Sequence, residues 1–142
     1  MKLMKNLYSV ILMILTISSC KQKTADELIA QKWTCVGINT TALEKQVTDF
    51  KDQFSLEMLK SNFLESSIQF FTDKTYEQYI KAYDYKLQGE YKFINDEKYI
   101  ICKHLNARKE DKEEQFEIMM LTEDSLKLLA KEDYVLVYIK KD

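Results

Sequence analysis

The chain has 142 residues, of which 21 are Lys or Arg and 23 are Asp or Glu, so its formal net charge is −2. Such a mildly acidic chain has no electrostatic footprint for nucleic acid, and its length suits one domain with a single core. It contains one histidine and two glycines, and it lacks G-x-S-x-G, H-E-x-x-H and a glycine-rich phosphate loop. We therefore expect neither an enzyme nor a cofactor site.

The N-terminus has the pattern of a secretory signal. Two lysines precede an apolar run over residues 7–17, which is followed by the small residues Ser18 and Ser19. The run is too short to span a bilayer as a helix. We expect residues 1–19 to be removed, which takes away two lysines and lowers the net charge from −2 to −4.

Residues 17–20, Ile-Ser-Ser-Cys, resemble the lipobox of bacterial lipoproteins. The resemblance implies that Cys20 is the first mature residue and carries acyl chains such as palmitate, since its sulfur is the only nucleophile left to bear them. One chain binds a bilayer only marginally, so more than one is implied. Lys21 is not acidic, which favours the outer membrane, with the domain in the periplasm or at the cell surface. The alternatives are an ordinary cleaved signal with a chance cysteine, or a short anchor helix.

Residues 20–31 are expected to form a polar tether from the lipid anchor to the domain. Within it, Thr24 and Glu27 have the spacing of a capping box, which predicts a helical turn. Residues 32–39 have the β-branched and aromatic content of a first strand, in which Trp33 should be a core anchor near one end.

An amphipathic helix is predicted at residues 42–63, inserted after the first strand. Thr41 and Glu44 have capping-box spacing at its start, while Ser55 could instead cap a second helix after a break at Gln53. A helix at this point in the chain could cover a barrel mouth. The apolar positions recur at intervals of three to four residues: Leu43, Val47, Phe50, Phe54, Met58, Leu59 and Phe63.

The rest of the chain alternates short apolar segments with polar turns. Short connections force antiparallel neighbours, and eight strands close most readily into an up-and-down barrel without exposed edges. The fold expected for residues 32–142 is therefore mainly β, an eight-stranded antiparallel barrel with a helical insertion. After the first strand, the others are expected at 67–72, 75–83, 85–94, 98–105, 114–122, 125–131 and 134–140.

Alternation along residues 85–94 should turn one aromatic-rich face inward. By contrast, the strands at 114–122 and 134–140 are partly apolar on both faces, so something must cover their outer side. We favour the inserted helix as that cover over an exposed protein-binding patch. The inward set is Tyr85, Leu87, Gly89, Tyr91 and Phe93.

Cys35, Cys102 and His104 are the remaining candidates for special chemistry. The two cysteines could pair, but the expected topology puts them on opposite sides of the barrel, whereas a disulfide needs Cα atoms within about 7 Å. Together with His104 they could suggest a metal site, although a zinc site usually has four protein ligands, or three and a water. We therefore expect two buried thiols, a surface histidine and no metal. The charged run at residues 108–114 lacks calcium-loop spacing and predicts a solvated hairpin loop.

Four short segments resemble the lipocalin-like domains of bacterial lipoproteins. Residues 29–33 are similar to L-x-G-x-W, residues 70–76 to F-x-x-D-G-T-Y, residues 89–91 to G-x-Y, and residues 118–128 to I-x-x-L-T-x-D-x-L-x-L. The resemblance implies a lipocalin-like barrel. It departs from the family at two positions where glycine is usual, Gln31 and Lys74. A lysine at position 74 implies either a turn without positive φ there or modest backbone strain.

Two functions remain open. The first is a lipid-anchored carrier or sensor that holds a small apolar or aromatic ligand inside the barrel, in a pocket formed by Trp33, Tyr85, Tyr91 and Phe93. A filled interior, without a cavity of roughly 300 Å³, would exclude it. The second is a membrane-tethered interaction module for an envelope protein, such as an inhibitor, immunity factor or assembly subunit. The chain is rich in tyrosine, which suits protein interfaces because it combines contact area with a polar end.

Overall fold

The computed structural model describes residues 22–105, 113–130 and 133–141. The signal segment, Cys20 and most of the charged run at 108–114 therefore lie outside the described residues. The helical elements are α2 (Ala25–Ile29), α3 (Thr41–Glu44), α4 (Phe50–Phe63) and the 3-10 turn η1 (Lys81–Tyr83). The strands are β1 (Lys32–Asn39), β2 (Ser67–Phe70), β3 (Thr75–Ile80), β4 (Tyr85–Ile94), β5 (Tyr99–His104), β6 (Glu113–Leu121), β7 (Ser125–Ala130) and β8 (Tyr134–Lys140).

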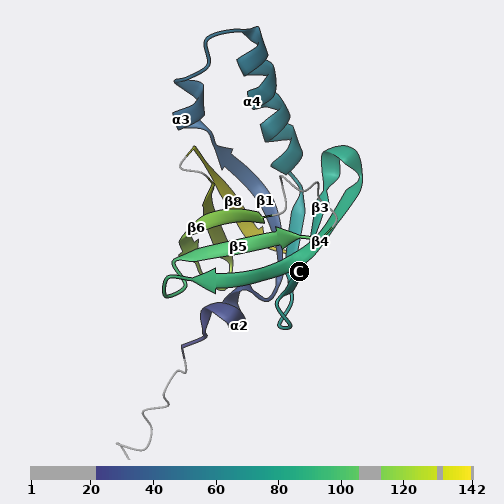
Figure 1. The fold of residues 1–142 in the computed structure, drawn as a ribbon, viewed down its shortest axis with the longest axis vertical. Coiled ribbons are helices and arrows are strands. Elements are labelled where there is room, and N and C mark those ends of the chain that lie inside the picture. The colour runs from purple at the N-terminus through teal and green to yellow at the C-terminus, as the bar shows by residue number, and fades with distance from the viewer. Residues whose placement is uncertain (1–21, 106–112, 131–132, 142) are drawn as a thin grey trace, which may run out of the picture.

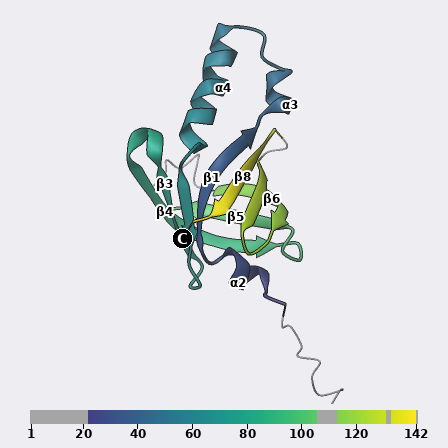
Figure 2. The same cartoon turned by 180° about the vertical axis from the view of Figure 1, so that it is seen from behind.

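The eight strands form one closed antiparallel barrel. Each strand pairs with the next in sequence, and β8 pairs with β1 to close the cylinder. Figures 1 and 2 show the short helix α2 under one end of the barrel and the helices α3 and α4 standing beyond the other. The prediction of a mainly β, eight-stranded up-and-down barrel with helices after the first strand is confirmed.

The barrel interior is the hydrophobic core. Strand alternation turns every second side chain inward, so that large residues from all eight strands meet there. Phe70 packs against Tyr91 in a T-shaped arrangement with ring centroids 4.9 Å apart, and against Tyr76 at 5.9 Å. The fully or almost fully buried residues include Trp33, Cys35, Phe70, Tyr76, Ile100, Cys102, Leu126, Leu128, Leu136 and Tyr138.

The closed end of the barrel is the end sealed by α2. Thr24 and Glu27 form the predicted capping box, and Ile29 at the end of the helix is fully buried. The indole Nε1 of Trp33 donates a hydrogen bond to the carbonyl oxygen of Ile29 at 3.0 Å. The prediction that Trp33 is a core anchor near one end is thus confirmed. The segment before β1 is more than a tether, however, because α2 belongs to the core.

Lys74 lies in the hairpin between β2 and β3 with a φ of 70°. Of the two expectations for this position, modest backbone strain is therefore the one that is confirmed. A left-handed conformation costs a residue with a Cβ about 1 kcal/mol or more. The Lys74 side chain offsets this cost, because it pairs with Asp26 of α2 and lies over the rings of Tyr91 and Phe93, 5.4 and 5.5 Å from their centroids. The lysine therefore ties the hairpin to the closed end.

The helical insertion differs from the single helix predicted at 42–63. It forms two helices separated by residues 45–49. Asp49 caps α4 by accepting a hydrogen bond from the backbone N–H of Asp52 at 2.9 Å, so the alternative break at Gln53 with a Ser55 cap is also wrong. The Ser55 hydroxyl instead donates to the Lys51 carbonyl oxygen within the helix. The apolar spacing runs through the break, which is why periodicity alone did not reveal it.

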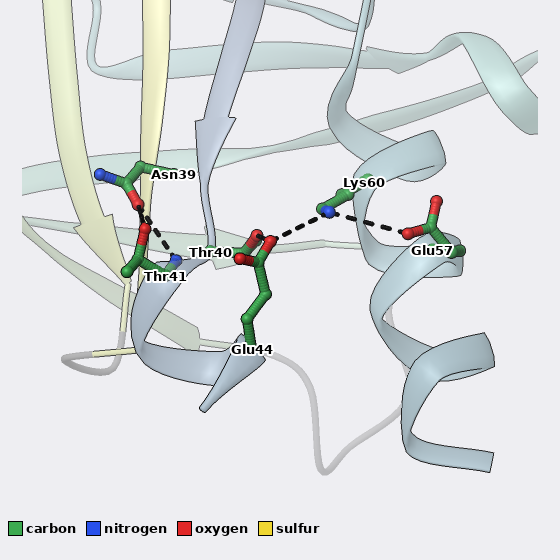
Figure 3. Close-up of polar contacts among 6 residues, drawn as sticks. All are labelled: Asn39, Thr40, Thr41, Glu44, Glu57 and Lys60. Carbon is green, nitrogen blue, oxygen red and sulfur yellow. Dashed lines mark hydrogen bonds and ion pairs between the residues drawn. The ribbon is translucent and has the colours of Figure 1, made fainter. Parts of the chain in front are cut away.

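The start of α3 is also shifted by one residue. Its N-cap is Thr40, whose hydroxyl donates to Glu44 Oε1 at 2.8 Å. Thr41 instead donates its backbone N–H and its hydroxyl to Asn39 Oδ1, at 3.1 and 2.8 Å (Figure 3). The Thr41 hydroxyl is thus engaged by the Asn39 side chain and does not cap the helix. The predicted Thr41 capping box is therefore wrong.

We expected the inserted helices to cover the outer face of β6 and β8, but they do not. The helix α4 contacts β1 and η1 beyond the end of the barrel, and α3 contacts β8. Met119, Met120 and Ile139 consequently remain exposed. Among the described residues, no helix has the length and apolar character needed to cross a membrane.

Candidate functional site

The four residues expected to form a ligand pocket do not surround a cavity. Trp33 seals the closed end, and the Tyr91 hydroxyl donates to the Phe71 carbonyl oxygen at 2.9 Å. Phe93 is half-buried and packs edge-on against Tyr91. Tyr85 is 46% exposed, so its predicted inward position is wrong. The alternation along β4 holds from Leu87 onward, but Tyr85 lies where the β3–β4 hairpin extends past the barrel wall (Figure 1).

The interior of the barrel is filled by its own side chains. The enclosed space among the described residues has a volume of about 10 Å³ and is lined largely by aromatic and aliphatic residues, including Phe63, Phe116 and Tyr138. That volume suits about one water molecule, whereas a drug-sized ligand needs roughly 300 Å³ or more. The described residues therefore leave no room for the expected ligand.

A polar cluster of Tyr76, His104 and Glu114 lies near the open end, the end of the barrel opposite α2. The Tyr76 hydroxyl is 2.5 Å from His104 Nδ1, and His104 Nε2 is 3.5 Å from Glu114 Oε2. His104 is only 6% exposed, so the expectation of a surface histidine is wrong. The signal that could have revealed this is alternation along β5, because His104 shares the inward face with Ile100 and Cys102.

Burial determines the chemistry of these interior groups. It raises the pKa of Tyr76 and of the Cys102 thiol well above their ordinary values, and it raises the pKa of Cys35 as well. Thiolate is the reactive form of cysteine, so buried thiols that stay protonated are poor nucleophiles. Both cysteines are free. Within residues 22–105, 113–130 and 133–141, no group of three or more acidic, His or Cys side chains could hold a metal ion.

Alkaline pH is expected to unfold the barrel as its buried tyrosines ionise. Burial raises the pKa of Tyr91 and Tyr134 from the ordinary 10.0 to about 12. A raised folded-state pKa of this kind contributes stability that is complete below pH 10 and is lost as the pH rises toward 12. The part of the tyrosinate absorbance that is lost in Tyr91→Phe and Tyr134→Phe variants should therefore change together with circular dichroism in this range. Ionisation of Tyr91 and Tyr134 at pH 10 in a folded barrel, assigned with Phe variants, would contradict this expectation.

The second candidate site is the α3–α4 hairpin, comprising residues 41–63. Phe50 is 83% exposed and Phe54 is 59% exposed, and with Met58 they follow one face of α4 at intervals of four residues. Residues four apart are neighbours on a helix surface. These three side chains therefore form a continuous exposed apolar stripe, which we call the Phe50 stripe.

The other side of α4 is packed. Leu56 is buried, and Phe63 at the end of the helix contacts Tyr134 with ring centroids 6.0 Å apart. A hollow of about 360 Å³ lies between the two helices and is lined by Leu43, Gln46, Val47, Asp52, Ser55, Leu56 and Leu59. The helix is thus apolar on two faces, of which only one is used by the fold.

One ion pair joins α3 to α4, and a second lies within α4. Lys60 Nζ lies 3.2 Å from Glu44 Oε1 and 3.7 Å from Glu57 Oε1, as Figure 3 shows. The Thr40 hydroxyl, and after it Lys60, lowers the pKa of Glu44 and so favours its charged form. These pairs are exposed and individually weak. The Lys60–Glu44 pair nevertheless connects the two helices.

The fold, a closed eight-stranded barrel sealed at one end by α2 and the buried Trp33, is similar to that of lipocalin-like proteins. The solved structures similar to it include a lipocalin-like protein from Bacteroides uniformis, with a TM-score of 0.53 and 13% identity over 80% of this chain and 98% of that one. A DUF4847 family protein from Bacteroides vulgatus has a TM-score of 0.51 and 11% identity, over 81% and 96% of the two chains.

A further protein from Bacteroides uniformis, whose structure was determined by NMR, has a TM-score of 0.50 and 20% identity, over 82% of this chain and 92% of that one. Identities this low show a shared fold alone. No family model and no curated protein matches the sequence.

Proposed function

We propose that the protein is a lipoprotein of the bacterial envelope whose filled barrel is a rigid scaffold that presents the α3–α4 hairpin to a protein partner. The observation that carries the proposal is the contrast between the two candidate sites. The barrel interior has about 10 Å³ of free space, whereas Phe50 and Phe54 are 83% and 59% exposed on a helix that extends beyond the end of the barrel.

The spacing of the Phe50 stripe indicates how the partner binds. Anchors that recur along one helix face suit insertion of the helix into an apolar groove. Aromatic anchors of this kind carry much of the binding energy at protein interfaces. Lys51 and Glu57 on α4 are exposed and charged, and they would lie at the polar rim of such an interface. The partner class is therefore a protein with an apolar groove that accepts one helix.

Replacing Phe50 and Phe54 together by glutamine should abolish partner binding while leaving stability within about 0.5 kcal/mol of wild type, because surface substitutions away from packed features have small effects. The matched control is Leu56→Gln on the buried face of α4, which should lower the free energy of unfolding by about 2 kcal/mol or more. Urea denaturation measures the stability of each variant. Crosslinking from a photoreactive residue at position 54 in intact envelopes measures binding.

A partner crosslinked equally from position 54 and from an exposed position on the barrel wall, such as Lys86, would contradict binding by the stripe. Loss of stability in the Phe50/Phe54 variant comparable to that of Leu56→Gln would show that the stripe is part of the fold.

A small apolar or aromatic ligand is a second candidate, favoured by the lipocalin-like fold and by the polar cluster of Tyr76, His104 and Glu114, which could orient a bound molecule. Such a ligand would have to displace Phe63 from the enclosed space at the open end. Native mass spectrometry of the protein extracted from membranes tests this function. A stoichiometric small-molecule mass that is lost on denaturation would support it, and a clean protein mass would count against it.

Cys20→Ser should release the protein from membranes. The acylated sulfur is proposed to be the only attachment, so the variant should lose the acyl mass and move to the soluble fraction. Intact-mass measurement and membrane flotation of wild type and variant provide the comparison. Cys35→Ser is the matched control, since Cys35 is buried in the barrel and its replacement should leave flotation unchanged. Retention of Cys20→Ser on membranes would contradict anchoring through this thiol.

A further inference from the structure

We infer that the closed end of the barrel faces the lipid surface and that the Phe50 stripe is held at the opposite pole of the molecule, pointing away from the anchoring bilayer. This inference rests on the proposed acylation of Cys20. It goes further by assigning the membrane-facing surface and the position at which a partner is met. The steps are the fixation of α2, the length of chain before it, and the nature of the surface around it.

The helix α2 is fixed to the barrel by contacts on several sides. Ile29 is fully buried and accepts the indole hydrogen bond of Trp33, while Asp26 pairs with Lys74 from the β2–β3 hairpin. On another side, Lys23 pairs with Glu123 at 2.8 Å. No single exposed ion pair would hold the helix, but a buried apolar residue, an indole hydrogen bond and two pairs to different hairpins act together.

Gln31 adds a hydrogen bond from its Nε2 to the Glu123 carbonyl oxygen at 3.0 Å, immediately after α2. The chain is therefore attached to the barrel from Lys23 onward. The segment that separates the anchor from the folded domain is correspondingly short.

Only three residue steps separate Cys20 from Lys23. A fully extended chain covers at most about 3.6 Å per residue, so the lipidated sulfur lies within roughly 10–15 Å of the closed end in any backbone conformation. A flexible tether of tens of residues would let the domain turn over at the membrane, but three extended residue steps reach only about 11 Å. The acyl chains therefore draw the closed end, and no other part of the barrel, to the lipid surface.

The surface around the closed end fits contact with lipid headgroups. Met119, Met120 and Ile139 are exposed on β6 and β8. The strand β6 contacts α2, so the β6–β7 turn lies at the closed end. Ile139 is close to this turn because it pairs with Ser125, which follows the turn. These side chains thus add apolar area beside the anchor point, where shallow burial among headgroups is favourable.

The closed end carries charges of both signs. Lys23 and Lys74 are paired with Glu123 and Asp26, Asp124 lies in the same β6–β7 turn, and Lys32, Lys140 and Lys141 are also exposed at this end. Attraction of these lysines to anionic lipid would act in the same direction as the anchor, but on a zwitterionic surface it is absent. On such a surface the orientation follows from the short anchor segment, and it should be insensitive to salt.

The Phe50 stripe lies at the far pole. The strand β1 runs from Lys32 at the closed end to Asn39 beside α3, and α4 extends further from the barrel with Phe50 at its outer end (Figures 1 and 2). Eight tilted strand residues and fourteen helical residues together separate Phe50 from the closed end by about 40 Å. A partner that binds the stripe is thus met well above the bilayer.

Energy transfer from a dye on the acylated protein to headgroup-labelled phospholipid in phosphatidylcholine vesicles tests the orientation. The dye is attached at Asp124→Cys near the closed end or at Lys51→Cys near Phe50, both exposed positions, while Cys35 and Cys102 are buried and should not react. We expect transfer to be several-fold more efficient from position 124 than from position 51, at low and high salt alike. Equal efficiencies, or the reverse order, would overturn the inference.

A variant with a lengthened anchor segment tests whether the short length of this segment causes the orientation. About 20 Gly and Ser residues inserted between Gln22 and Lys23 reach roughly 25 Å and should bring the two transfer efficiencies together. A difference that survives the insertion would show that the segment length does not set the orientation. The intact mass of the same samples separates the proposed acylation from the proposed orientation. A missing acyl mass refutes the lipoprotein itself. An acylated protein with the wrong order of transfer efficiencies refutes only the orientation.

Discussion

Gly89→Ala is expected to lower the free energy of unfolding by at least about 3 kcal/mol, a large part of the stability of a domain of this size. A Cβ at Gly89 would lie 2.2 Å from the Lys103 carbonyl oxygen and 2.6 Å from Cε1 of Tyr76. The first contact is with backbone, so β4 and β5 would have to separate where Gly89 pairs with His104. The second would displace Tyr76 from His104. Urea denaturation followed by circular dichroism measures the loss.

Gly37→Ala is the matched control for this prediction. A Cβ at Gly37 meets only Val137 Cβ, at the ordinary contact distance of 3.8 Å. Removing a glycine also restricts the unfolded chain, so this variant should be within about 1 kcal/mol of wild type and on the stable side. Equal denaturation midpoints for the two alanine variants would show that the close approach at Gly89 is not a constraint on the fold.

Trp33→Ala should cost about 3–5 kcal/mol, the usual range for truncating a fully buried tryptophan. Trp33 joins β1 to α2 through its hydrogen bond to Ile29, so the variant should also free α2 from the closed end. Hydrogen exchange at the backbone amides of α2 should then increase more than exchange elsewhere in the barrel. A uniform increase over all strands would indicate loss of global stability without specific release of the helix.

Trp33→Phe separates packing from hydrogen bonding at this position. The phenyl ring keeps much of the apolar volume but cannot donate to the Ile29 carbonyl oxygen, and the loss expected is about 1–3 kcal/mol. A cost equal to that of Trp33→Ala would mean that the hydrogen bond dominates the contribution of the indole. Because Trp33 is the only tryptophan, tyrosine fluorescence or circular dichroism must follow both variants.

The strand pattern was predictable because it depends on local periodicity. Residues 32–39, 85–94 and 134–140 were expected as strands and are strands with the same bounds. The capping box of Thr24 and Glu27 was also predictable, since both partners lie within one helical turn. Short polar turns restricted each strand to pairing with its neighbours, and this was sufficient to predict a closed barrel.

The candidate sites were much less predictable. Tyr85 has the alternation of an inward residue, but it lies at the point where β4 leaves the barrel wall. His104 has an inward position by the same pattern, because it shares a strand face with Cys102, yet it was expected at the surface. The fate of Phe50 and Phe54 depended on where α4 lies relative to the barrel, and their spacing is the same in a buried helix and an exposed one.

The sequence by itself determined the eight strands, their antiparallel order, the capped turn before them and the buried role of Trp33, because each of these depends on residues close together in the chain. The tertiary structure alone decided that the interior is filled, that α2 seals one end and that α4 stands beyond the other. These features depend on which side chains from distant strands occupy the same volume, and on which face of a helix finds a surface to pack against. Packing of that kind leaves no local pattern in the chain.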